Sequence, residues 1–469
     1  MRTSFVFLLC ALLSGCSATQ TPSSATQSSL TPALAETAQD LMRQAREDNL
    51  AYEVVESLTT EVGPRLAGTA AEERARQWAV VKLRQLGFSN VRVEPFTLPV
   101  WERGEERAEI IAPYPQAMQI TALGGSSSTG AQGVTGEIAA FASLAELSEA
   151  EDDSLRGKIV FVDESMSRSQ DGSGYSAAVK KRRATAYEAQ RLGASAALIR
   201  SVGTSSHRFA HTGQMRRVTA AGSPGVPTAA LSAPDADQLQ RILDRGQSLT
   251  LRLVITPRQL PPATSGNVIA EIPGSTLAQE IVLVGAHLDS WDLGTGAVDD
   301  GAGVGIVVGA AHALMRLMPD QPQRTIRIVL FGAEEVGLVG ARAYAERYAD
   351  ELAMHVVATE SDFGSGNIWR FDTRVPEHRL ALAGEVGVVL QPLGIGPGNN
   401  RATGGPDMLY IREAGVPVVT LLQNGWDYFD LHHTADDTLD KIAPDALDQN
   451  VSAYVAFLYL MAQMPGNFR

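Results

Sequence analysis

The hydrophobic pattern divides the chain into three regions. From Leu34 to Leu86 apolar residues recur at helical spacing, interrupted at residues 63–69 by glycine and proline, which require a loop. Residues 71–86 restart as a helix, and residues 91–96 are typical of a strand. This first region predicts helices and a strand but shows no candidate chemistry.

From Val268 onward, short and almost continuous apolar runs alternate with helical segments. The runs lie at residues 281–284, 326–330, 356–358 and 416–420. Strands buried on both faces have this composition, so the region predicts an α/β fold with a mixed, largely parallel sheet flanked by helices. Functional groups in such sheets collect at the carboxyl ends of the strands.

Between these regions, residues 113–257 change to short β segments and glycine-rich turns. Strands are expected at residues 157–162, 196–199 and 226–231, with one helix over Thr185–Leu192. We therefore expect one domain built from residues 34–112 and 258–469, interrupted by a smaller, β-rich α/β insert at residues 113–257.

The amino terminus has the features of an export signal. Its apolar run, residues 5–13, is far shorter than the roughly 20 residues of a membrane span. The run ends in Leu13-Ser14-Gly15-Cys16, which resembles a bacterial lipobox, so residues 1–15 would be removed and Cys16 lipidated. The alternative is an ordinary cleaved signal with an incidental cysteine. Residues 16–33 predict a flexible tether, and Ser17 favours the outer membrane, facing the periplasm.

Composition narrows the function classes. The 469 residues are 44% hydrophobic and 20% charged, which is typical of globular proteins and allows two folded units. A net charge of -14 argues against nucleic acid as a partner. The two cysteines are Cys10, inside the signal, and Cys16, so the mature chain should have no disulfide.

Carboxylates and histidines gather after the predicted strands. The clusters are His287 and Asp289; Asp299 and Asp300; Glu334 and Glu335; Glu360 and Asp362; and His432 and His433. Zinc binds imidazole nitrogen and carboxylate oxygen, and a pair of zinc ions needs a bridging ligand. Each cluster alone would be interpreted as surface charge, as a turn or as polar residues in a loop. Together and in this order, the clusters indicate a metal site.

This order of motifs resembles the M28 family of zinc exopeptidases, and is most similar to its carboxypeptidase Q branch. The resemblance implies two zinc ions per chain. His287 and Asp362 would hold one zinc, Glu335 and His433 the other, and Asp299 would bridge them. His432 remains the alternative to His433.

The resemblance also implies the supporting roles. Glu334 would be the general base that takes a proton from the attacking water. Asp289 would accept the other imidazole N–H of His287 and fix its tautomer. Asp300 would follow a cis peptide bond after the bridging aspartate.

The insert resembles a protease-associated domain, although an unrelated small α/β insert is an alternative. The small residues at 301–305 are expected to let a helix pack closely on the sheet rather than to bind a nucleotide. His211, within the insert, is interpreted as an exposed loop histidine, with contact to the substrate as the alternative.

The expected function is hydrolysis of terminal peptide bonds in short peptides or dipeptides, by a protein attached to the membrane through lipid only. An aminopeptidase with the same metal site is the main alternative. A glutaminyl-cyclase-like enzyme with one zinc and a non-catalytic binding lipoprotein are weaker ones. The resemblance further implies a homodimer.

Overall fold

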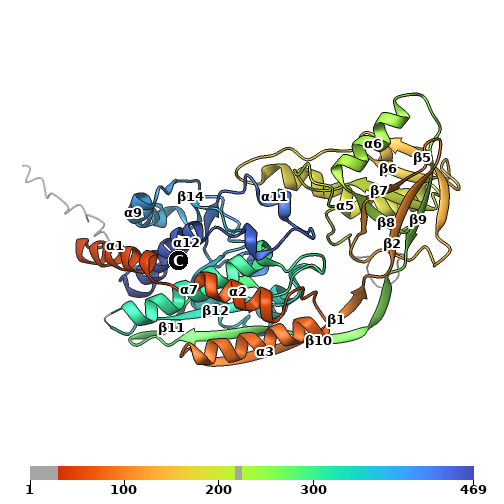
Figure 1. The fold of residues 1–469 in the computed structure, drawn as a ribbon. Coiled ribbons are helices and arrows are strands. Elements are labelled where there is room, and N and C mark those ends of the chain that lie inside the picture. Colours follow the sequence, from red (N-terminus) through yellow and green to blue (C-terminus); the bar gives the residue numbers. More distant parts are fainter. Residues whose placement is uncertain (1–29, 217–223, 319) are drawn as a thin grey trace, which may run out of the picture.

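The computed structural model of the chain describes residues 30–216, 224–318 and 320–469, arranged as two lobes (Figure 1). The predicted signal, residues 1–15, and the lipidation site Cys16 lie outside the described residues. Helix α1 begins at Pro32, and the Thr31 hydroxyl accepts the Leu34 N–H at its start. The helix therefore includes the last two residues of the predicted tether.

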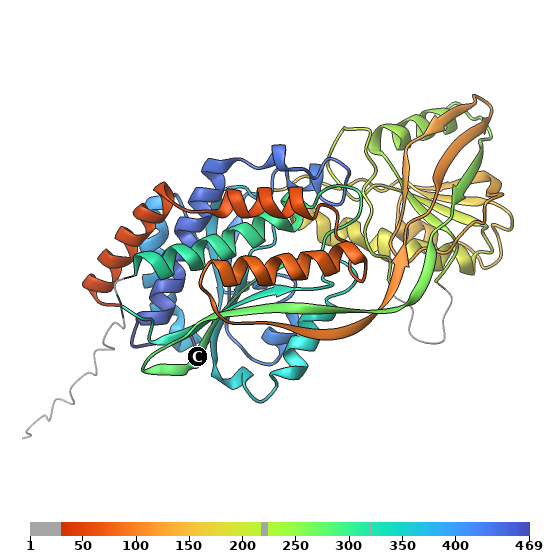
Figure 2. The same ribbon diagram turned by 60° about the horizontal axis from the view of Figure 1, so that its bottom comes forward.

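The larger lobe is built on an eight-stranded mixed sheet, which confirms the predicted fold class (Figure 2). The four central strands are parallel, and the strands beside them pair in antiparallel fashion. In spatial order the strands are β1 (Ser89–Glu102), β10 (Arg258–Ile272), β12 (Arg324–Phe331), β11 (Leu277–His287), β13 (His355–Glu360), β16 (Val418–Gln423), β14 (Ile368–Arg374) and β15 (Gly396–Pro397). All residues of β12 and β13 are buried, as their apolar runs predict.

Helices cover both faces of this sheet. They are α1 (Pro32–Glu47), α2 (Ala51–Glu61), α3 (Ala70–Gln85), α7 (Ala302–Leu317), α8 (Val339–Arg347), α9 (Leu380–Leu390), α10 (Leu409–Glu413), α11 (Tyr428–Leu431) and α12 (Pro444–Gln463). The stretch Ala297–Leu317, which includes α7, is long and apolar enough to cross a membrane, but 89% of its most apolar window is buried. Burial of this kind is typical of a core helix.

Small residues in α7 serve close packing, as expected, both at the sheet and against another helix. A Cβ added to Gly303 would lie 2.0 Å from the backbone oxygen of Ser361, directly after β13. A Cβ added to Gly305 would lie 2.7 Å from the backbone oxygen of Ala51, at the start of α2. A Cβ on Gly309 would also meet Ala51 at about 3.1 Å. Glycine therefore lets α7 and α2 approach more closely than larger residues would permit.

The smaller lobe contains a second eight-stranded sheet. Its strands are, in spatial order, β3 (Gln116–Met118), β2 (Glu106–Ala112), β9 (Thr250–Ile255), β5 (Val134–Phe141), β6 (Ile159–Val162), β7 (Ala196–Arg200), β8 (Thr228–Leu231) and β4 (Ile120–Ala122). Helices α4 (Leu144–Ser148), α5 (Ser173–Arg191) and α6 (Ala233–Leu243) accompany it. This sheet includes β2, so it contains residues from Glu106 onward, before the predicted boundary at residue 113.

Helix α5 is much longer than the predicted helix at Thr185–Leu192. Its middle contains a run of four basic residues, residues 180–183, which precedes the predicted helix. In the structure Lys181 and Arg182 are buried, and their charged groups reach oxygen atoms of Glu164 and Tyr175. These two buried charges therefore have polar partners inside the lobe.

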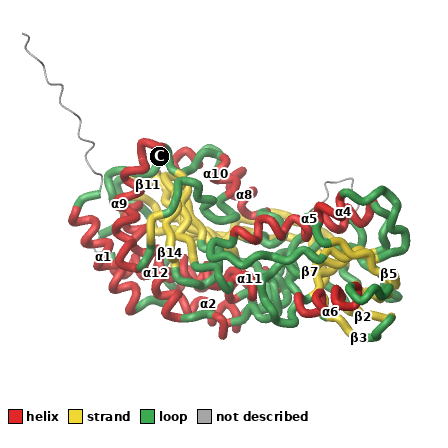
Figure 3. Tube along the Cα trace, turned by 90° about the horizontal axis from the view of Figure 1, so that it is seen from above, coloured by secondary structure: helices red, strands yellow, loops and turns green. Residues whose placement is uncertain are grey.

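The two lobes are joined by β1 and β10, which pair from Ser89 and Glu271 to Glu102 and Arg258. Seen from above, the lobes lie next to each other along one axis (Figure 3). Helix α5 and the loop leading into α11 meet at the junction of the lobes (Figure 1).

Candidate active site

The carboxyl ends of three neighbouring parallel strands meet at one edge of the larger sheet. Strand β11 ends at His287, which pairs with Phe331 at the end of β12. Glu360, at the end of β13, pairs with Gly285 of β11. Asp362 and the turn containing Glu334 follow these strand ends directly, so the sheet brings together motifs far apart in the sequence.

Asp299 lies between the two histidines that are expected to bind different zinc ions. Its Oδ1 atom is 3.1 Å from Nε2 of His287, and its Oδ2 atom is 3.4 Å from Nε2 of His433. Asp362 Oδ1 lies 3.6 Å from the same His287 nitrogen, and Glu335 Oε2 lies 2.9 Å from the His433 nitrogen. The five expected ligands therefore form one cluster with Asp299 at its centre.

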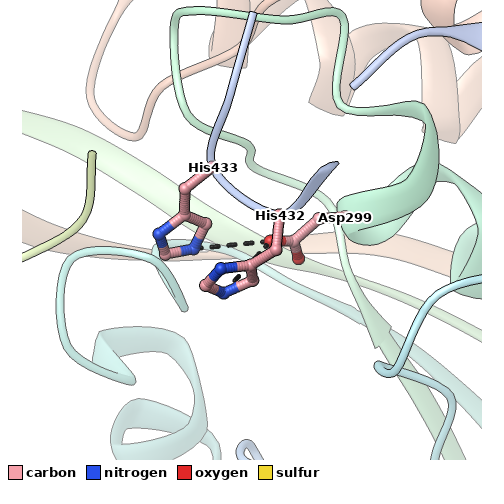
Figure 4. A group of neighbouring side chains, drawn as sticks. All are labelled: Asp299, His432 and His433. Carbon is pink, nitrogen blue, oxygen red and sulfur yellow. Dashed lines mark ion pairs between the residues drawn. The ribbon is translucent and has the colours of Figure 1, made fainter. Parts of the chain in front are cut away.

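His432 and His433 both approach this central carboxylate (Figure 4). Their rings are stacked with centroids 3.5 Å apart, and Nε2 of His432 lies 3.7 Å from Asp299 Oδ2. Only His433 also contacts Glu335. Its Nδ1 atom lies 3.2 Å from the carbonyl oxygen of Thr212 and 3.3 Å from Nη1 of Arg182, whereas its Nε2 atom faces the carboxylates of Asp299 and Glu335. The geometry favours His433 as the ligand.

Asp300 and Asp437 hold the turn that carries Asp299. The Asp300 carboxylate accepts the N–H groups of His287 and Gly303, which ties the end of β11 to the start of α7. The peptide bond between Asp299 and Asp300 is cis. Asp437 accepts the N–H groups of Val298 and Asp299 at 2.6 and 3.2 Å. Two carboxylates therefore position the backbone around Asp299.

Asp289 supports the site in a different way from the predicted one. Nδ1 of His287 lies 2.9 Å from the backbone oxygen of Asp289, whereas the Asp289 carboxylate is 3.8 Å away from it. The carboxylate accepts instead the N–H groups of Glu334 and Glu335. The expected tautomer of His287 is thus set by a carbonyl, and the carboxylate of Asp289 holds the Glu-Glu turn.

Glu334 follows Ala333, which adopts a left-handed conformation with φ of 60°, uncommon for a residue other than glycine. The Glu334 side chain lines a cavity next to Asp299 and Asp362. Burial and the negative charges of Asp362 and Asp407 raise its pKa well above the ordinary value, although His287 opposes this rise. Glu334 thus lies beside the cluster as a group able to exchange a proton.

The electrostatics of the cluster fit divalent cations. Burial lowers the pKa of His287, but the Asp362 and Asp299 carboxylates outweigh it and raise that pKa well above its ordinary value. Among the described residues, Oδ2 of Asp299 and Oε1 of Glu335 are buried without a hydrogen-bond partner. Uncompensated buried carboxylates are costly, and imidazole with carboxylate is a donor set that zinc prefers. The residues present therefore fit the zinc ions that the sequence implies.

The cavity beside the cluster has a volume of about 820 Å³ and is lined by both lobes. Tyr175, Arg182, Arg183, Gln214 and Met215 come from the smaller lobe, and Glu334, Phe363, Tyr428 and the ligand residues from the larger one. A small peptide would therefore contact both lobes.

His211 is neither exposed nor part of the cavity lining, which corrects both interpretations of it. It is 2% exposed, and its Nδ1 atom lies 2.7 Å from the carbonyl oxygen of His432. The next residue, Thr212, donates its N–H to the carbonyl oxygen of His433. The smaller lobe thus holds the loop that carries the expected ligand.

Sequence reasoning missed several of these supporting residues. Asp437 lies four residues after His433, and the pair Asp436-Asp437 was a visible signal of the kind used for the other clusters. Tyr428 interacts with Asp299 through its side chain, and Tyr175 packs its ring 5.2 Å from that of His432. These tyrosines gave no signal, because an aromatic residue in a helix usually reads as core.

Comparisons with known proteins agree with this geometry. The family model "Peptidase family M28" matches residues 267–458. Carboxypeptidase Q from Bos taurus is 35% identical, over 89% of this chain and 86% of its own. The solved structure of a peptidase M28 precursor from Shewanella amazonensis is 47% identical with a TM-score of 0.91, covering 93% of this chain and 98% of that one.

A zinc aminopeptidase from Bacillus subtilis shares the fold, with a TM-score of 0.65 at 22% identity over 89% of this chain and 95% of its own. The fold and the buried histidine-carboxylate cluster define the class of metallopeptidases. The chain belongs to peptidase family M28.

Proposed function

We propose that the protein is a two-zinc exopeptidase that hydrolyses terminal peptide bonds of short peptides, including dipeptides. The observation that carries the proposal is the position of Asp299, whose two oxygens face His287 and His433 on opposite sides. A carboxylate in this position can bridge two cations, with Asp362 and Glu335 completing the two ligand sets. The relatives named carboxypeptidase Q support the substrate class.

When bound, zinc ions polarise the scissile carbonyl and make water acidic enough to attack near neutral pH. Glu334 accepts the proton of the attacking water and returns it to the leaving amine. Asp289 keeps Glu334 and Glu335 in one turn, so the base and a ligand stay aligned. The cavity walls from both lobes hold the peptide against this edge.

An aminopeptidase with the same site is the second candidate, supported by the related fold of the Bacillus subtilis enzyme. We further propose that lipidated Cys16 holds the enzyme at the outer membrane, facing the periplasm, a location that rests on the amino-terminal sequence alone. Peptides entering the envelope would then be its substrates.

The test combines metal content with hydrolysis of free dipeptides, N-blocked dipeptides and an aminoacyl-anilide, for wild type and Glu334→Gln. We expect two zinc ions in both proteins and a loss of about 10²- to 10⁴-fold in kcat for the variant. A single zinc would favour cyclase-like chemistry, which cyclisation of an N-terminal glutamine would reveal. Undiminished activity of the variant would show that Glu334 is not the base.

A further inference from the structure

Helix α5 forms a wall of the cavity next to the expected metal ligands. Tyr175, Arg182 and Arg183 line this wall, and they span about 12 Å of helix at 1.5 Å per residue. The Tyr175 ring lies against His432, and Arg182 Nη1 is 3.3 Å from Nδ1 of His433. The helix therefore lies directly beside the metal cluster.

Three arginines line the cavity, and two of them already have partners. Arg182 is buried and donates to the Tyr175 hydroxyl at 2.7 Å. Arg342, on the opposite lobe, donates to the Tyr410 hydroxyl at 2.7 Å and stacks on that ring. Each of these guanidinium groups is thus engaged by a tyrosine.

Arg183 differs from both. Its side chain is exposed and, within residues 30–216, 224–318 and 320–469, has no hydrogen-bond or ion-pair partner. Arg183 directly follows Arg182, whose Nη1 atom is 3.3 Å from Nδ1 of His433, and both arginines line the cavity. Among the described residues, the cavity therefore has one guanidinium without a partner.

The cavity has few carboxylates outside the expected ligand set. Within the described part of the chain, these are Asp171 and Glu334. One oxygen of Asp171 accepts the N–H of Ser173 at the start of α5, and Glu334 is the proposed base. The guanidinium of Arg183 is a partner on this wall for an anionic peptide end.

We propose that Arg183 binds the free C-terminal carboxylate of the substrate, so that the leaving residue points toward α5. The inference rests on the proposed peptidase function and adds which end of the peptide substrate is recognised. A guanidinium binds a carboxylate through two parallel hydrogen bonds. Each further residue moves the carboxylate by up to about 3.5 Å, so a single guanidinium fixes the distance from the chain end to the bond that is cut.

The experiment compares alanyl-alanine with its C-terminal amide as substrates of the zinc-loaded protein. Wild type should prefer the free acid by roughly 10- to 100-fold in kcat/KM, the range of a hydrogen bond to a charged group. Arg183→Gln should lose that factor for the acid and change the amide by less than about twofold. Arg183→Lys should have a preference for the acid between those of wild type and Arg183→Gln, because lysine keeps the charge but cannot donate two parallel hydrogen bonds.

Lys180→Gln is the matched control, because Lys180 is exposed on the same helix but does not line the cavity. It should leave both substrates unchanged. Equal losses on acid and amide in Arg183→Gln, or no loss on either, would overturn the proposal.

Binding separates this inference from the proposed function. In zinc-loaded Glu334→Gln protein, calorimetry should show alanyl-alanine binding roughly 10- to 100-fold more weakly once Arg183→Gln is added, with binding of the amide unchanged. If wild type cut neither compound, the peptidase proposal would fail, whereas this titration would still decide the role of Arg183. Equal affinities for the acid with and without Arg183 would refute it.

Discussion

The two halves of the proposed two-zinc site are built in different ways. His287 and Asp362 lie at the ends of neighbouring parallel strands, and the backbone of the larger lobe alone fixes them. Glu335 and His433 lie on loops, and His433 is placed by contacts from the smaller lobe. The first half follows from the sheet, whereas the second half needs two lobes to meet.

The contacts between the lobes concentrate on the loop that leads to His433. Thr204 donates its N–H to the carbonyl oxygen of Phe429, and the Arg168 side chain pairs with both carboxylate oxygens of Asp430. His211 and Thr212 then contact the backbone of the histidine pair itself. The smaller lobe is therefore a structural part of the metal site as well as a wall of the cavity.

Removal of the His211 side chain should separate the two halves most clearly. His211→Ala deletes the hydrogen bond to the His432 carbonyl, so the zinc expected at Glu335 and His433 should bind about 10- to 100-fold more weakly. Chelator competition on the purified protein would measure both zinc affinities. The zinc at His287 and Asp362 should change little. His211→Asn, whose amide can replace the Nδ1 donor, should restore binding, and parallel loss of both zinc ions would contradict the comparison.

His355 offers a buried histidine outside the site for contrast. It contacts the Tyr344 hydroxyl and the Glu351 carbonyl, and burial lowers its pKa to about 4, as burial does for His211. Because this folded-state pKa lies below the ordinary 6.5, the unfolded chain binds the proton first, and stability falls as pH decreases between these values.

His355→Gln should therefore reduce the loss of unfolding free energy between about pH 6.5 and pH 5 by about 1.5 kcal/mol. Urea unfolding at the two pH values measures this difference. Both zinc affinities at neutral pH should equal those of wild type. A change in either zinc affinity would show that loss of any buried histidine, and not only of His211, weakens zinc binding.

The smallest effect is expected from the ion pair between the lobes. The side chains of Arg168 and Asp430 are 28% and 22% exposed, and partly exposed pairs contribute about 1 kcal/mol or less. Arg168→Ala should therefore weaken the zinc at His433 by no more than about fivefold in the same chelator assay. A loss as large as that of His211→Ala would mean that the lobes are held mainly by charge.

The sequence was most informative where the sheet dictates the geometry. His287 and Asp362 could be placed together because parallel strands end at one edge, and the buried runs identified those strands. The role of the Asp289 carboxylate could not be predicted, because the carbonyl of the same residue supplies the bond to His287. Contacts such as those of His211 depend on how two lobes meet, and no local pattern encodes that.

Helix α5 is a second case in which the local sequence pattern could not predict the contacts of the side chains. Of the four basic residues at positions 180–183, Lys181 and Arg182 are buried, whereas Lys180 and Arg183 are exposed, and Arg183 but not Lys180 lines the cavity. Residue type gave the charge of each side chain, but only the packing of the lobe decides which of them can meet a ligand.

The strand pair that joins the lobes bears on how the smaller lobe could have been gained or lost during evolution. Glu102 and Arg258 are register partners, so the polypeptide leaves the larger lobe and returns to it at neighbouring positions, about 5 Å apart. A segment with adjacent ends can be gained or lost as one genetic cassette without disturbing the sheet beneath it. Here the inserted segment also carries Thr212, whose carbonyl oxygen contacts His433, an expected zinc ligand. Loss of the segment would therefore leave the larger sheet intact but remove a contact that holds one half of the proposed metal site.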